Sequence, residues 1–189
     1  MNMKDLKEII LKNKDKFNKT CEKYNIYPDK LKEFLGEEIY SSPASTMKNM
    51  YGAYPGGLIN HILLVTKYAM NINSLLPEKN KVEDSSIIKV CFLFQIGKVH
   101  LFKLCESEWH RNNQGKMYDY NEDLVSMRVG ERSAYYSINN GVSLSEEEYQ
   151  SIINFDKPED DKMSKFHGST LSIILRQANE LAIIEQKSE

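Results

Sequence analysis

His61 is the residue of this chain whose type and position first suggest chemistry. It follows a Tyr-Pro-Gly-Gly turn at residues 54–57 and lies beside an apolar stripe. An imidazole in that place can serve as a ligand of a divalent metal. The same arrangement is typical of a hydrogen-bonded histidine in a helical core. Spacing alone therefore leaves two interpretations of His61 open, a metal ligand and a core residue.

The element that must position His61 is a helix that starts at the Pro-Gly-Gly turn. Apolar residues recur there every three or four positions, which is the spacing of one buried helix face. They are Leu58, Ile62, Val65, Ala69 and Ile72. The turn residues favour a sharp change of chain direction before the helix. We therefore predict a helix with His61 in its first turn, next to the buried face.

A second helix is expected to reach the same interior. After a loop at residues 77–84, Gln95 shares one side of a second helix with Ile87, Ile88 and Cys91, so it should face the elements that pack on the His61 helix. A last helix spans about residues 169–186 and carries Asn179. Its predicted buried residues are Leu171, Ile174, Leu175, Ala178, Leu181 and Ala182.

Three segments resemble the HD-domain metal-dependent phosphohydrolases. Residues 56–65, Gly-Gly-Leu-Ile-Asn-His-Ile-Leu-Leu-Val, are similar to the family's first helix, whose histidine is a metal ligand. Residues 92–98, Phe-Leu-Phe-Gln-Ile-Gly-Lys, are similar to its second signature, Leu-Leu-His-Asp-Ile-Gly-Lys. Residues 42–58 are similar to a small branch common in bacteria and their viruses. The resemblance implies a mostly α fold, an HD-like helical bundle, here with a small inserted β-hairpin.

The chain departs from this family at the positions that would hold the metal. Phe94 and Gln95 replace the histidine-aspartate doublet, and Asn179 replaces the final aspartate ligand. Where the branch has further histidines, this chain has Tyr51, Val129 and Phe155. A carboxamide is a weak, neutral ligand and a phenylalanine is none. We therefore expect no cofactor at this centre, whereas an active enzyme would require manganese, nickel, iron or magnesium.

Some residues around the implied pocket are retained. The resemblance places five of them where a phosphate could bind: His61, Lys98, Lys103, Glu131 and Arg132. Basic groups at the rim of such a pocket can hold an anion through charge-assisted hydrogen bonds. The predicted ligand is a nucleotide or another phosphorylated small molecule. In the alternative interpretation, Lys98 and Arg132 are surface charges or members of structural ion pairs.

Composition bounds the class of protein. With 189 residues, 41% of them hydrophobic and 28% charged, the chain has the composition of one globular domain. We divide it into an N-terminal helical extension, residues 1–38, and a degenerate HD-like domain, residues 39–189. The formal net charge of -2 provides no field for nucleic acid, which we do not expect as a partner. Three unpaired cysteines and the absence of an apolar leader or span predict a cytoplasmic protein without a membrane partner.

The remaining segments have local signals. We predict helices over residues 3–25 and from Asp29, as N-cap, to Gly36. Strand-like residues 99–104 and 117–120 predict the hairpin, and Ser145 with Glu148 forms a capping box. Residues 156–165 are a charged loop. His100, Cys105 and His110 are spaced at five, which is a poor spacing for a shared metal on either a strand or a helix.

Three hypotheses of function follow. The first is a catalytically inactive HD-like protein that acts as a binding or interaction module, with a small molecule or a protein as partner. The second is an active metal-dependent phosphohydrolase acting on a nucleotide or phosphoester. The third is a protein whose surface helices form a homo-oligomer.

Overall fold

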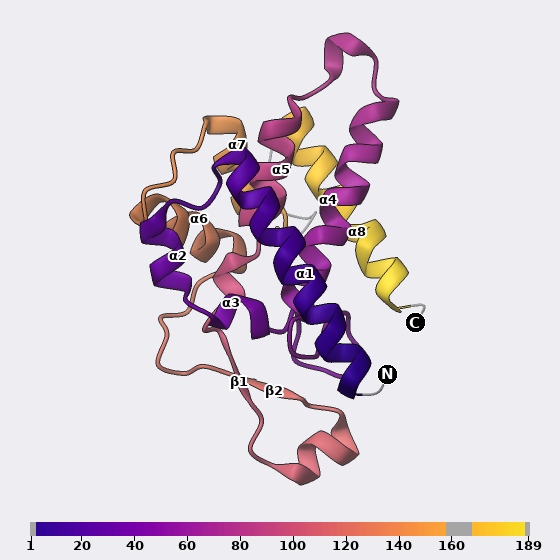
Figure 1. Cartoon of the computed structure of the whole chain (residues 1–189), viewed down its shortest axis with the longest axis vertical. Helices are drawn as coiled ribbons and strands as arrows, with labels where there is room; N and C mark the ends of the chain where they lie inside the picture. The colour runs from indigo at the N-terminus through magenta and orange to yellow at the C-terminus, as the bar shows by residue number, and fades with distance from the viewer. Residues whose placement is uncertain (1–2, 158–167, 188–189) are drawn as a thin grey trace.

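The structure, a computed structural model, describes residues 3–157 and 168–187. It is mostly helical, with one short antiparallel hairpin (Figure 1). The α-helices are α1 Met3–Tyr24, α2 Asp29–Leu35, α3 Glu38–Ser41, α4 Gly57–Leu75, α5 Asp84–Leu93, α6 Val129–Asn139, α7 Glu146–Asn154 and α8 Thr170–Lys187. The shorter elements are η1 Glu78–Asn80, η2 Ile96–Lys98, β1 Phe102–Leu104, the π-helical turn η3 His110–Gln114 and β2 Tyr118–Tyr120.

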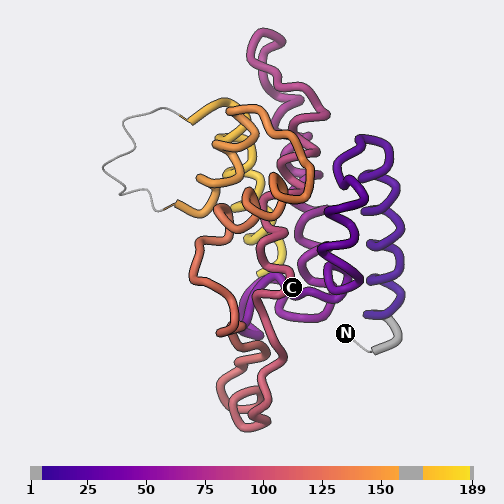
Figure 2. The backbone as a smooth tube through the Cα atoms, turned by 90° about the vertical axis from the view of Figure 1, so that its left-hand side faces the viewer, coloured from indigo at the N-terminus to yellow at the C-terminus, as the bar shows by residue number. Residues whose placement is uncertain are grey.

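The helices pack in layers around α4 and α5. Figure 2 shows α1 on one side of these two helices and α6, α7 and α8 on the other. Helix α4 packs most extensively on α8 and α5. Burial of the apolar faces of these helices supplies most of the stability of a helical bundle.

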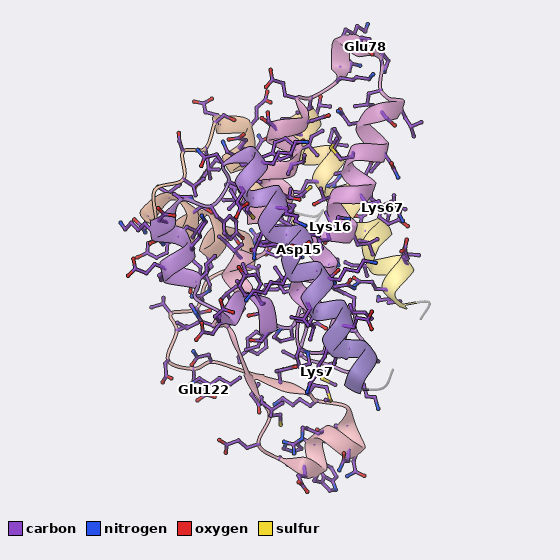
Figure 3. All side chains as sticks on the ribbon, viewed as in Figure 1. Lys7, Asp15, Lys16, Lys67, Glu78 and Glu122 are labelled. Carbon is purple, nitrogen blue, oxygen red and sulfur yellow. The ribbon has the colours of Figure 1, made fainter. Side chains whose placement is uncertain are left out.

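The N-terminal helices share the core of the rest of the chain. Phe17 of α1 stacks on Phe92 of α5 with 4.8 Å between ring centroids. The Tyr27 hydroxyl, just before α2, donates a hydrogen bond to the Phe92 carbonyl at 3.1 Å. The charged side chains of α1 lie on its outer face, as Lys7, Asp15 and Lys16 do in Figure 3. The described part of residues 1–38 therefore contributes to one continuous hydrophobic core.

The hairpin projects away from the helical layers (Figure 1). Its strands pair antiparallel, with Phe102 opposite Tyr120. Both strands are shorter than the sequence predicted, and the connection contains η3 instead of a simple turn. A bridge between Met47 and Lys116 attaches the hairpin to the loop before α4.

Most local expectations are confirmed, and three details are wrong. The capping box of Ser145 and Glu148 is present, and Gly36 ends α2 with a positive φ of 58°. Pro28, not Asp29, is the N-cap of α2, because Asp29 already has helical geometry. Leu181 is 40% exposed on the outer face of α8. His61 is the fifth residue of α4, one turn in. In the predicted loop 156–165, residues 158–165 lie outside the described part of the chain.

Candidate functional site

Side chains from three helical segments converge on His61. Its Nε2 lies 2.9 Å from Oδ1 of Asn179 on α8, and Nε2 of Gln95, which follows α5, donates to the same oxygen at 3.4 Å. On the other side of the ring, Nδ1 lies 2.6 Å from Oε1 of Gln186. His61 and Gln95 are fully buried. The prediction that Gln95 faces the elements packed on the His61 helix is confirmed.

The hydrogen bonds of His61 indicate which of its ring nitrogens carries the proton. Asn179 Oδ1 already accepts from Gln95, so we infer that Nε2–H of His61 is a second donor to it. A neutral imidazole then accepts at Nδ1. Rotating the Gln186 carboxamide by 180° exchanges its oxygen and nitrogen, and its NH₂ group then donates a hydrogen bond to Nδ1. In this arrangement the ring lies between two uncharged carboxamides.

Lys98 supplies the charge of this cluster. Its Nζ donates to the Ala44 carbonyl at 2.6 Å, to Gln95 Oε1 at 3.0 Å and to the Tyr51 hydroxyl at 3.1 Å. The three protons of the ammonium are thus all used. Lys98 is only 7% exposed, and among the residues the structure describes, no carboxylate hydrogen-bonds to it. The cluster therefore has one buried positive charge and neutral partners.

Aromatic rings cover the cluster. The Tyr51 ring lies 4.4 Å from the His61 ring, and Phe94 lies 6.3 Å from it on another side. Phe155, which follows α7, packs edge-on against Phe94 at 4.8 Å. Five of the six substituted positions are therefore linked by direct contacts around His61. Val129, the sixth, is the first residue of α6, and its carbonyl oxygen lies close to Gly97 of η2.

Burial and the neighbouring ammonium lower the pKa of His61 to about 4. Removal from water is the largest cause, because it disfavours the imidazolium form, and the charge of Lys98 acts in the same direction. The hydrogen bonds with Gln186 and Asn179 raise the pKa but do not offset these two effects.

We expect the stability of the protein to fall as the pH falls from about 6.5 to about 4. The unfolded state binds a proton at His61 in this range and the folded state does not, so protonation favours unfolding. A shift of this size corresponds to roughly 3 kcal/mol over the whole range. Urea unfolding of the wild type and of His61→Gln at several pH values measures it. The variant should lose the steep part of the pH dependence, whereas His110→Gln, outside the cluster, should keep it.

The turn before α4 brings Tyr51 to His61. Ala44 N donates to the Gly52 carbonyl at 2.8 Å, and the Ser45 hydroxyl donates to the Tyr51 carbonyl at 2.7 Å. A Cβ atom on Gly57 would lie 2.1 Å from the Gly52 carbonyl oxygen, so only glycine fits. The glycine at position 57 of this segment is therefore required by backbone packing.

The Gly-Glu-Arg-Ser segment at the start of α6 also has a packing role. Ser133 Oγ accepts from Gly97 N at 2.9 Å and donates to the Phe94 carbonyl at 2.8 Å. A Cβ atom on Gly130 would lie 2.3 Å from the Ile152 carbonyl oxygen. These contacts fix the end of α5 and η2, and with them Gln95 and Lys98.

The donor set of the cluster does not fit a divalent metal. Within residues 3–157 and 168–187, no three side chains of His, Cys, Asp or Glu converge. Around His61 the nearest oxygens belong to carboxamides and a phenol, and a lysine ammonium adds positive charge. Hard divalent cations prefer carboxylates, and neutral donors leave the desolvation of the ion uncompensated.

The residues predicted to hold a phosphate do not share one pocket rim. Lys98 is an interior group, so its predicted place at the rim is wrong. Arg132 is 4% exposed and donates to the Val125 carbonyl, and its Nε has no partner among the described residues. Lys103 forms an exposed ion pair with Asp123 at 2.6 Å. The alternative interpretation of Lys98 and Arg132 as surface charges is wrong as well, because both side chains are buried.

The remaining candidate residues are Glu131 and the group of His100, Cys105 and His110. Glu131 is exposed, and its carboxylate accepts from Arg128 N at 3.3 Å at the start of α6. His100 packs edge-on against Phe34 at 5.8 Å, and the thiol of Cys105 lies near the Ser107 carbonyl. Among the described residues, the side chains of His100, Cys105 and His110 do not converge on one point.

Sequence reasoning missed Gln186, although a signal was present. Gln186 stands seven residues after Asn179, two helical turns along the same face of α8. Beside it lies a cavity of about 570 Å³, which the sequence did not predict. Its lining residues are Lys48, Met50, Gly52, Ala53, Tyr54, Arg111, Asn112, Gly115, Met117 and Gln186.

Comparison of the chain with models of protein families, with curated protein sequences and with solved structures finds no match. In the part of the chain that the structure describes, no helix has the length and apolarity to cross a membrane.

Proposed function

We propose that this protein is a catalytically inactive HD-like domain that acts as a binding module. The observation that carries the proposal is the state of the cluster around His61. Gln95 and Asn179, at the positions where the HD resemblance expects carboxylates, meet at His61 as neutral carboxamides, and Gln95 accepts from the Lys98 ammonium. Since these residues come from distant parts of the sequence, their meeting supports the alignment on which the resemblance rests.

Electrostatics supports inactivity. Metal-dependent phosphoester hydrolysis needs a cation that lowers the pKa of a bound water and neutralises charge on the phosphoryl oxygens. Here a second cation would enter beside an ammonium without an anion to compensate it. His61 has a pKa of about 4 and both ring nitrogens in hydrogen bonds, so it is neutral at pH 7 and already engaged.

A metal and activity assay tests the proposal. We expect purified protein to contain less than stoichiometric manganese, nickel, iron and magnesium, and to hydrolyse neither phosphomonoesters nor nucleotides when these metals are added. Elemental analysis and a phosphate-release panel measure both properties. His61→Ala serves as the matched control, because metal-dependent turnover that disappears in this variant would establish the active phosphohydrolase instead.

A further inference from the structure

We infer that the cavity beside Gln186 is a binding site for a small phosphorylated molecule with a planar, hydrogen-bonding ring. The inference rests on the proposed binding function and gives it a place and a ligand chemistry. The cavity has about 570 Å³, within the range of pockets that hold small ligands. It is formed by the loop before α4, the connection between β1 and β2, and the end of α8.

The walls of the cavity are fixed by backbone hydrogen bonds. Lys48 N donates to the Gly115 carbonyl at 2.7 Å, and Met117 N donates to the Thr46 carbonyl at 2.8 Å. On the other side, the bond from Ala44 N to the Gly52 carbonyl closes the loop before α4. A pre-formed pocket binds with a smaller loss of conformational entropy than one that must be ordered by its ligand.

The charge of the lining favours an anion. Among the described residues that line the cavity, Lys48 and Arg111 are cations and none is a carboxylate. Lys48 is exposed, and its ammonium makes no ion pair with a described residue. Arg111 donates to the Cys105 carbonyl and forms an ion pair with the exposed Glu108 at 3.8 Å. A phosphate can therefore bind here by charge-assisted hydrogen bonds.

The other lining groups suit a planar ring. Met50 and Met117 provide polarizable apolar surface, and the ring of Tyr54 provides an aromatic wall. Asn112 and Gln186 carry carboxamides, which can pair with a neighbouring donor and acceptor on the edge of a base. Gln186 also hydrogen-bonds to His61, so an occupant would contact a residue of the buried cluster.

Calorimetric titration with AMP, in metal-free buffer with a chelator, tests the site. We expect AMP to bind, and to bind more tightly than adenosine or inorganic phosphate alone, because each of these supplies only part of the contacts. Lys48→Glu should weaken AMP binding roughly tenfold, since it reverses one of the two positive charges of the lining. Asn112→Ala should weaken AMP binding without changing that of phosphate. Lys16→Glu, an equal charge change on α1 away from the lining (Figure 3), should bind AMP as the wild type does.

Three results would overturn the inference. AMP binding that is the same in Lys48→Glu and Lys16→Glu would place the ligand elsewhere and leave the binding function itself intact. Equal affinity for AMP and adenosine would show that the anion contributes nothing. Absence of binding of all three probes at millimolar concentration would exclude this ligand class. None of these results bears on metal content or turnover, which decide the proposed function separately.

Discussion

Phe94→His, Gln95→Asp and Asn179→Asp together are expected to create a divalent metal site around His61. Ligand atoms about 2.1 Å from an ion and at right angles to one another are about 3 Å apart. The 2.9 Å between His61 Nε2 and Asn179 Oδ1 matches that spacing, and Gln95 Nε2 lies 3.4 Å from the same oxygen. An aspartate at position 95 is one methylene shorter than Gln95, so its carboxylate reaches less far toward the ion. What is missing is negative charge and a second imidazole, and the three substitutions supply both.

We expect the triple variant to bind Mn²⁺ roughly 100-fold or more tightly than the wild type, because two carboxylates compensate the desolvation of the ion. Titration calorimetry and electron paramagnetic resonance of Mn²⁺ measure the change. Phe94→His alone is the matched control, since it adds an imidazole without charge and should gain little affinity.

Either of two results would contradict this prediction. A wild type that binds Mn²⁺ as tightly as the triple variant would show that neutral donors suffice here, and the proposal of inactivity would fail. A folded triple variant without measurable affinity would show that Lys98 and the aromatic rings exclude the ion irrespective of ligand charge. A circular dichroism melt establishes that the variant is folded.

Gly57→Ala is expected to destabilise the protein by roughly 3 kcal/mol or more. The new Cβ would lie 2.1 Å from the Gly52 carbonyl oxygen and 2.7 Å from its carbon, both of them backbone atoms that cannot rotate away. The loop before α4 must therefore move, and with it Tyr51, which covers His61 and accepts from Lys98. For a chain of this length the melting temperature should fall by about 6–12 °C.

Thermal and urea unfolding measure this effect, with Gly168→Ala as the matched control. Among the described residues, a Cβ at Gly168 would meet Ser172 alone, at an ordinary distance of 3.6 Å, and the backbone there does not have a positive φ. The control should change the stability by less than about 0.5 kcal/mol. Equal stabilities of the two variants would show that the loop before α4 adapts freely, and that its glycines do not determine the position of Tyr51.

The largest features of the fold could be predicted from the sequence. Apolar residues at three- and four-residue spacing predicted α4, α5 and α8, because an amphipathic helix must bury that face wherever it packs. The Ser145 capping box was predictable because its bonds lie within one turn. The position of Gln95 was predictable because it directly follows the buried stripe of α5, whereas only the resemblance placed Asn179 opposite His61.

Only the tertiary structure decided what surrounds His61. Nothing near Lys98 in the sequence indicates that its ammonium turns inward to Ala44, Tyr51 and Gln95, because two of these partners lie about fifty residues away. The same holds for the cavity, whose walls come from three segments that local propensity does not bring together. Local patterns fix the elements and the buried faces. Charge in an interior depends on which groups finally meet there, and that is set by the packing of the whole chain.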